Sequence, residues 1–112
     1  NDGALSPPTG AFVVARSAGQ AVGCGGVAYR DGGFAEIKHM WVSETIRGQG
    51  LGYKLLIDLE MIASHAGFSV VRLDSNNTLT EAHKLYRRCG YLEVARYNDN
   101  PYAELWFEKV VT

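Results

Sequence analysis

The sequence predicts an α+β domain with one mixed, strongly twisted β-sheet and elements in the order β-β-β-α-β-α-β-β. The N-terminal part holds strand-like runs separated by glycine-containing turns. At Gly50 the apolar spacing changes to that of a helix. A strand then follows this helix, and a strand–helix–strand unit of this length requires a parallel pair with a right-handed crossover. With 112 residues the chain has room for one core, so residues 1–112 are predicted to form a single domain.

Three antiparallel strands are expected first. The valine-rich run 12–16 predicts a strand, and a turn at 17–20 leads into a returning strand over 21–30. Asp31-Gly32-Gly33 predicts a tight hairpin, because such residues supply the positive φ angles that the turn needs. The third strand is expected over 34–42, and the first ten residues resemble a linker.

The second half alternates helices and strands. Apolar residues at helical spacing predict a helix over 50–66, which Gly67 ends. A strand over 69–74 follows, and Thr78-Leu79-Thr80-Glu81 resembles a capping box for a helix over 79–88 that stops at Gly90. The last two strands are expected over 91–97 and 104–111, with a turn at 98–101.

Composition and charge exclude several classes of protein. The chain is 46% hydrophobic and 21% charged with a net charge of −1, which is typical of a globular domain. Its longest basic run is Arg87-Arg88, so nucleic acid is not an expected partner. No apolar stretch reaches the roughly 18–20 residues that span a membrane, and we expect a cytoplasmic protein without a membrane partner. Cys24 and Cys89 are expected as two buried free thiols.

The loop Arg47-Gly48-Gln49-Gly50-Leu51-Gly52 lies between a strand and a long helix. Glycines let the backbone approach a ligand closely, and the first amides of a helix have no partner within it. Such a loop favours phosphate, and most naturally a pyrophosphate, with Arg47 adding a charged contact. No Gly-Lys-Ser/Thr follows, so the loop is not a P-loop, and its spacing does not match a dinucleotide fingerprint either.

The stretch from Ala35 to Glu108 resembles the GNAT superfamily of acetyl-CoA-dependent N-acetyltransferases. Four segments carry the resemblance: AEIKHMWV (35–42), RGQGLG (47–52), EAHKLYRRCGY (81–91) and YNDNPYAELWFEK (97–109). The resemblance implies a GNAT-like sheet and acetyl-CoA as co-substrate, with its pyrophosphate on the amides of Gln49 to Gly52. It also implies that the backbone of Met40, Trp41 and Val42 pairs with the pantetheine arm like an added strand.

The resemblance also implies candidates for the two proton transfers. Tyr86 matches the family tyrosine that faces the thioester sulfur, and a phenol of pKa ~10 can protonate a thiolate of pKa ~8.5 at a cost of about 2 kcal/mol. Glu36 matches the base of the histone-acetylating branch; the alternative is an exposed carboxylate that pairs with Lys38 or Arg30. His39 could serve as the base instead. Because the amine attacks directly, neither cysteine needs a catalytic role, and no Cys/His spacing suggests a metal site.

Two features depart from the family pattern. Where many members have an asparagine three residues before the alanine matched by Ala82, this chain has Leu79. Asn76 and Asn77 lie nearby and are candidates for contacting pantetheine, with Asn77 included in the predicted cofactor site. The family's opening β-α-α segment is missing, so we expect the edge strand 12–16 either to self-associate, for example in a homodimer, or to be completed by another chain.

Two functions are consistent with these features. The first is an acyltransferase that moves an acetyl group from acetyl-CoA to a primary amine of a small molecule or peptide. The alternative is a CoA-binding sensor or interaction domain without turnover. The presence of both Glu36 and Tyr86 favours the enzyme.

Overall fold

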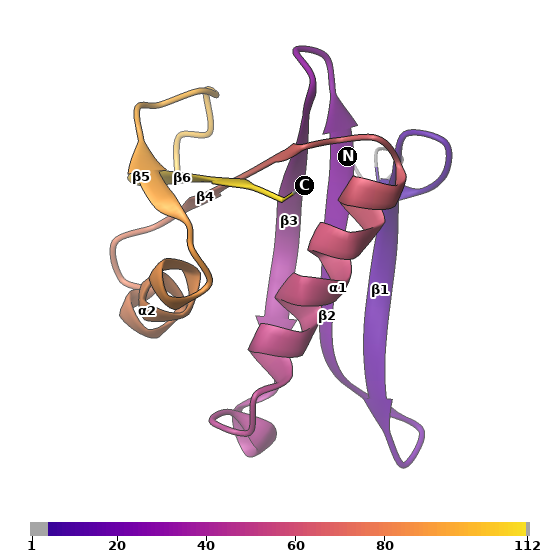
Figure 1. Cartoon of the computed structure of the whole chain (residues 1–112). Coiled ribbons are helices and arrows are strands. Elements are labelled where there is room, and N and C mark those ends of the chain that lie inside the picture. The colour runs from indigo at the N-terminus through magenta and orange to yellow at the C-terminus, as the bar shows by residue number, and fades with distance from the viewer. Residues whose placement is uncertain (1–4, 112) are drawn as a thin grey trace.

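The computed structural model describes residues 5–111 and contains one six-stranded sheet in the order β1-β2-β3-β4-β6-β5 (Figure 1). The α+β fold class and the order of its elements are confirmed. The elements are β1 (Gly10–Ser17), β2 (Gln20–Arg30), β3 (Phe34–Val42), the short 3-10 helix η2 (Glu44–Ile46), α1 (Leu51–His65), β4 (Val70–Ser75), α2 (Thr80–Arg88), β5 (Leu92–Val94) and β6 (Leu105–Val110).

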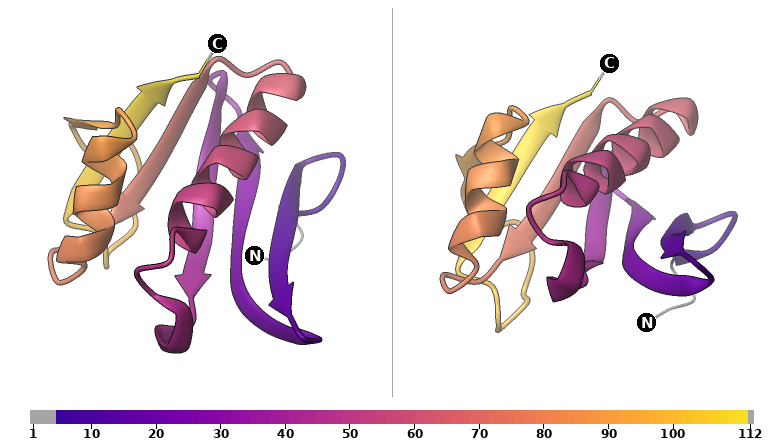
Figure 2. Two further views of the ribbon diagram at one scale, coloured as in Figure 1. Left: turned by 60° about the horizontal axis from the view of Figure 1, so that its bottom comes forward. Right: turned by 90° about the horizontal axis from the view of Figure 1, so that it is seen from below.

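The sheet consists of two antiparallel halves that meet at one short parallel pair. Strands β1 to β3 form the first half and β4, β6 and β5 the second. Between the halves, β3 pairs with β4 only at Ala35–Val71 and Glu36–Arg72. Beyond these residues the two strands diverge, and both helices lie on one face of the sheet (Figure 2).

The core lies between the helices and this face. Leu56 and Leu59 of α1 and Tyr86 of α2 are buried against Val71 and Phe107 of the sheet. Because side chains alternate along a strand, Glu36 of β3 and the residues on either side of Val71 point to the opposite face. Polar side chains gather on that opposite face, where neither helix covers them.

Strand β3 contains a bulge close to the point where it leaves β4. Cys24 of β2 lies opposite Trp41 and Gly26 lies opposite Lys38, so His39 and Met40 together face Gly25. His39 has a φ of 57°, which is unusual for a residue with a side chain. A bulge of this kind twists the strand more strongly and helps to separate its end from β4.

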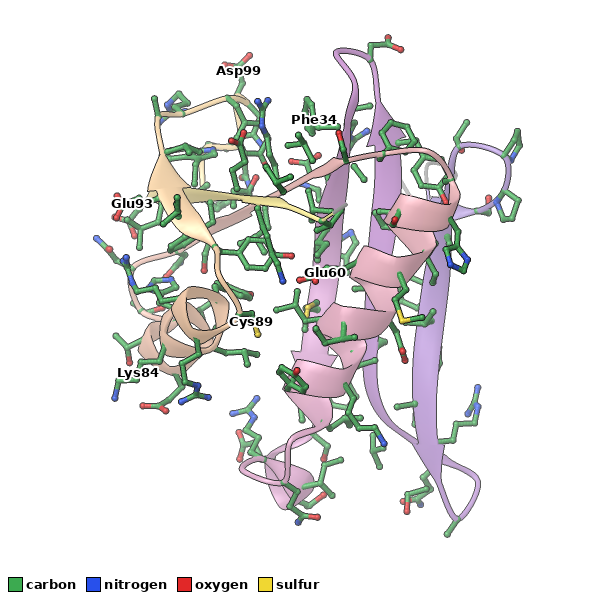
Figure 3. The ribbon with its side chains drawn as sticks, viewed as in Figure 1. Phe34, Glu60, Lys84, Cys89, Glu93 and Asp99 are labelled. Atoms are coloured by element: carbon green, nitrogen blue, oxygen red, sulfur yellow. The ribbon has the colours of Figure 1, made fainter. Side chains whose placement is uncertain are left out.

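A buried ion cluster also joins the two halves. Glu60 of α1 accepts hydrogen bonds from the Tyr91 hydroxyl and from the Lys109 ammonium, both at 2.9 Å. Figure 3 shows Glu60 on the side of α1 that faces the second half of the sheet. This cluster ties α1 to the second half although β3 and β4 share few hydrogen bonds.

The capping box predicted before α2 is wrong. The backbone and hydroxyl of Thr78 both donate to Asn76 Oδ1, at 2.8 Å and 2.6 Å. This local turn uses the groups that a capping box needs, so the helix starts at Thr80 after an uncapped Leu79. The positive φ angles of Gly67 and Gly90 confirm both predicted helix ends.

The penultimate strand is shorter than predicted, because β5 ends at Val94 instead of residue 97. Tyr97 and Asn98 leave the strand direction and place their side chains against Glu36 of β3. Hydrogen bonds to a buried carboxylate thus replace further strand pairing in this segment.

Of the ten residues predicted as a linker, 1–4 lie outside the described part of the chain, whereas Leu5 is buried beside Gly26 and Gly10 begins β1. Strand β1 is an edge of the sheet and exposes Phe12 and Val14, and association through this edge stays a prediction.

Both cysteines are free, but each is partly exposed, so the expectation of buried thiols is wrong. Within the described part of the chain, no helix is both long and apolar enough to cross a membrane.

Candidate active site

The divergence of β3 from β4 leaves one edge of β3 without a strand partner. Pairing stops at Glu36 and Arg72, so the backbone from Ile37 to Val42 is bonded to β2 on one side only. Free amide and carbonyl groups of this kind can pair with an extended ligand as they would with another strand.

The glycine loop lies at the end where this gap opens. Gly48 has a φ of 83° and Gly50, the N-cap of α1, has a φ of 86°. No side chain caps this helix, and the first bond of the helix runs from the Lys54 amide to the Gly50 carbonyl at 3.1 Å. The amides of the first turn therefore point out of the helix end without a partner from it.

The space in front of the loop is open. A side chain at Gly48 or Gly50 would meet no atom within 4 Å. The Arg47 side chain donates from Nε to the Val42 carbonyl at 3.1 Å and so fixes the loop to the end of β3. An open backbone cradle at a helix N-terminus beside a fixed arginine suits the diphosphate of a coenzyme.

Tyr86 lies on the face of α2 that packs on the second half of the sheet. Its ring packs on Phe107 and Tyr91, and the residue is only 8% exposed. Its hydroxyl makes no hydrogen bond to residues 5–111, yet no buried side-chain oxygen there lacks a partner, so the oxygen reaches solvent. Burial and then the negative charge of Asp74 raise the pKa of Tyr86 above the usual 10.0, which keeps the phenol protonated.

Glu36 is buried on the other face of the sheet and is only 3% exposed. Its Oε1 accepts from Nε and Nη2 of Arg30, both at 2.8 Å. Its Oε2 accepts from the Tyr97 hydroxyl at 2.8 Å and from Asn98 Nδ2 at 2.9 Å. The exposed carboxylate considered from the sequence is therefore wrong, although the pairing with Arg30 is present.

Asn98 connects the two diverging strands. Its Nδ2 also donates to Asp74 Oδ2 on β4 at 2.6 Å, and its Oδ1 accepts from Trp106 Nε1 at 2.9 Å. Tyr97, Asn98 and Asp74 were missed from the sequence. The run Asn98-Asp99-Asn100-Pro101 was recognised as a turn, and Asn98 does accept from the Asn100 amide, but its contacts across the sheet left no local signal.

The chain matches a known family over most of its length. Residues 2–91 match the model of the acetyltransferase (GNAT) family. The chain belongs to this family. An IAA acetyltransferase from Azospirillum brasilense is 38% identical over 90 residues, which cover 80% of this chain and 59% of the relative. The chain spans about three fifths of the length of the first two curated relatives that it matches.

Solved structures agree with the GNAT fold. A Klebsiella pneumoniae protein assigned to the acyl-CoA N-acyltransferases superposes with a TM-score of 0.84 at 34% identity, covering 95% of this chain and 75% of that one. An aminoglycoside 6′-N-acetyltransferase complexed with coenzyme A superposes with a TM-score of 0.79 at 17% identity, covering 96% and 76%. The second likeness concerns the fold alone.

The remaining candidate residues of this GNAT domain lie on β3 and just before α2. Met40, Trp41 and Val42 form the free edge of β3, whereas His39 is exposed at the bulge. Asn77 is exposed before α2, where its backbone amide donates to Glu104 Oε1 at 3.0 Å.

His83 of α2 is buried and shares a hydrogen bond of 2.9 Å with Ser75 of β4. Within residues 5–111, no group of three or more His, Cys, Asp and Glu side chains is placed to hold a metal ion.

The buried tyrosines of this GNAT domain predict a loss of stability at alkaline pH. Burial raises the pKa values of Tyr86, Tyr91 and Tyr97, with Glu60 and Glu36 adding to the shifts of the last two. The unfolded chain releases these protons at about pH 10, while the folded protein keeps them. The stabilisation is thus complete below pH 10, and the free energy of unfolding falls above it by about 1.4 kcal/mol per pH unit for each tyrosine.

Urea unfolding between about pH 9 and pH 12 measures this slope. Tyr91→Phe should reduce the slope by the share of one tyrosine, about 1.4 kcal/mol per pH unit. Tyr102→Phe, at a residue that is 80% exposed, should leave the slope unchanged. A free energy of unfolding that stays constant through pH 11 in the unsubstituted protein would contradict the prediction.

Proposed function

We propose that this GNAT domain transfers an acetyl group from acetyl-CoA to a primary amine of a small molecule or peptide, by direct attack of the amine on the thioester. One observation carries the proposal. The edge of β3 is free from Ile37 to Val42, the uncapped glycine loop follows this strand, and Glu36 lies at its last pair with β4. The relative named as an acetyltransferase and the coenzyme A complex of a protein with this fold support it.

The backbone supplies most of the contacts to the coenzyme. We expect the amides of Gln49 to Gly52 to hold the pyrophosphate, with Gly48 allowing the turn and Arg47 adding charge. The free edge of β3 at Met40, Trp41 and Val42 pairs with the pantetheine arm, and Asn77 lies before α2 as a further contact. When bound, acetyl-CoA supplies a thioester carbon that an unprotonated amine can attack.

Glu36 is the proposed acceptor of the amine's proton. Its Oε1 is held by the Arg30 guanidinium, whereas its Oε2 accepts from two neutral donors, Tyr97 and Asn98. A proton therefore enters on Oε2, where it displaces a neutral hydrogen bond instead of a charged one. His39 remains the alternative base, and its exposed position on the bulge would require a water to relay the proton.

Tyr86 is the proposed donor of the proton to the leaving thiolate. Its hydroxyl reaches solvent although its ring is buried, so it can face a ligand in the gap. Its raised pKa makes it a weaker acid than an ordinary phenol, which increases the cost of protonating a thiolate. Tyr86 therefore contributes less to the rate than the base does.

Tyr86→Phe is expected to lower kcat by about 10- to 100-fold, because only the proton donor is lost. The coenzyme affinity, measured by calorimetry with CoA, should stay within about twofold, since the proposed coenzyme contacts come from other elements. Tyr53→Phe on the exposed side of α1 is a matched control that should leave both values unchanged. An unaltered kcat in Tyr86→Phe at every pH would remove Tyr86 from the mechanism.

An acetyl-CoA-dependent thiol-release assay with a panel of amines tests the proposed function. Release of CoA that depends on an added amine, with the acetylated amine detected by mass spectrometry, is the expected result. Calorimetric binding of CoA without release for any amine would instead support a CoA-binding sensor or interaction domain. Absence of CoA binding would contradict both functions.

A further inference from the structure

A pocket of about 540 Å³ lies on the face of the sheet opposite the helices. Strand β3 and the loop before β6 supply most of its wall, and the labelled Phe34 and Asp99 mark these two sides in Figure 3. Its volume is within the range of small-molecule sites. The lining residues are Arg30, Asp31, Phe34, Glu36, Lys38, Tyr97, Asn98 and Asn100.

The acceptor groups inside the pocket are mostly occupied. Each oxygen of Glu36 already accepts two hydrogen bonds, so a ligand can bond this carboxylate only by displacing one of these donors. Asn98 uses both lone pairs of Oδ1 for Trp106 and the Asn100 amide. Asp74 of β4 accepts one hydrogen bond on each oxygen, from Asn98 and from Asn100.

The two cationic side chains of the pocket are ion-paired but keep N–H groups without a hydrogen-bond partner in the described chain. The Lys38 ammonium lies 3.8 Å from Glu36 and 3.8 Å from Asp74, beyond hydrogen-bond distance, and makes no hydrogen bond to residues 5–111. Arg30 directs Nε and Nη2 to a single oxygen of Glu36, so three of its five N–H groups have no partner in the described chain. The side chains of Lys38 and Arg30 are 26% and 37% exposed, so both can reach a ligand.

We propose that the acceptor amine also carries a carboxylate, as a free amino acid does, and that Lys38 with Arg30 binds this carboxylate in the pocket. The inference rests on the proposed N-acetyltransferase function and adds the substrate class. The unused N–H groups of Lys38 and Arg30 can bond a carboxylate, which forms stronger charge-assisted hydrogen bonds than a neutral acceptor does. Asp31 is exposed on the β2–β3 turn and stands at the outer end of the pocket.

The test compares amines that differ in the carboxylate alone. Several amino acids are each paired with their amide, for example phenylalanine with phenylalaninamide, and kcat/KM is expressed per unprotonated amine. A charge-assisted hydrogen bond to a ligand carboxylate predicts that the carboxylate form is favoured by about 10- to 100-fold. Equal kcat/KM values within every pair would overturn the proposal.

Substitutions at Lys38 show whether this residue is the source of the preference. Lys38→Met should lower kcat/KM for the amino acids toward that of their amides, while the amides stay within about threefold, and Lys38→Arg should restore part of the preference. Lys84→Met is the matched control, because Lys84 is 67% exposed and points away from the sheet on α2 (Figure 3). An equal loss for both acceptor forms in Lys38→Met would overturn the assignment to Lys38.

A binding measurement that needs no turnover completes the test. Calorimetry with N-acetylphenylalanine and its amide, in the presence of CoA, should show tighter binding of the carboxylate form, and Lys38→Met should remove the difference. Acetylation of amides and amino acids at equal rates would defeat this inference while the proposed function stands. Absence of both CoA binding and thiol release would defeat the proposed function itself.

Discussion

Glu36→Gln is expected to lower kcat/KM for the amine by about 10²- to 10⁴-fold, which is the range for loss of a general base. Glutamine has nearly the same shape but cannot take the amine's proton on Oε2. Steady-state kinetics at saturating acetyl-CoA, with the amine varied, measure this loss.

The controls for this prediction separate the loss of the general base from a loss of folding stability. Glutamine leaves Arg30 without its charged partner, so urea unfolding is measured alongside, with an expected loss of about 1–3 kcal/mol. Tyr97→Phe removes one donor to Oε2 but keeps the carboxylate, and it should therefore retain most of the rate. If Glu36→Gln kept most of the rate, the base would be His39 or a water molecule.

Gly50→Asp is expected to weaken CoA binding at least 100-fold. The new carboxylate would stand in the open space in front of the loop, at the N-terminus of α1. Two unit charges 4 Å apart near a protein surface repel by about 4 kcal/mol, which exceeds the roughly 2.7 kcal/mol of a 100-fold change. Calorimetric titration with CoA measures the effect directly, without any need for turnover.

Gly50→Asn is the matched control for this substitution. Asparagine has the same shape and the same cost of adopting a φ of 86°, but it carries no charge. The difference between the aspartate and asparagine variants thus isolates electrostatic repulsion from backbone strain. Equal CoA affinities for the unsubstituted protein and Gly50→Asp would show that the pyrophosphate binds elsewhere.

Most element boundaries followed from local patterns. The third strand was predicted at its observed ends, and the first helix within one residue at each end. Gly50 and Gly67 adopt positive φ angles at the two ends of α1, where glycine has no steric penalty. The start of α2 was also predicted within one residue, but its capping box was wrong, because Thr78 bonds to the nearby Asn76 instead.

The sequence by itself determined the elements, their order and the glycine loop, because turn residues and apolar periodicity act over a few neighbouring positions. The tertiary structure alone decided the environment of Glu36. Its partners Tyr97 and Asn98 lie 61 and 62 residues further along the chain. They meet it only because β3 and β4 stop pairing after two residue pairs and the loop before β6 folds across the gap between them. Contacts of that kind depend on sheet register and strand divergence, which no local pattern encodes.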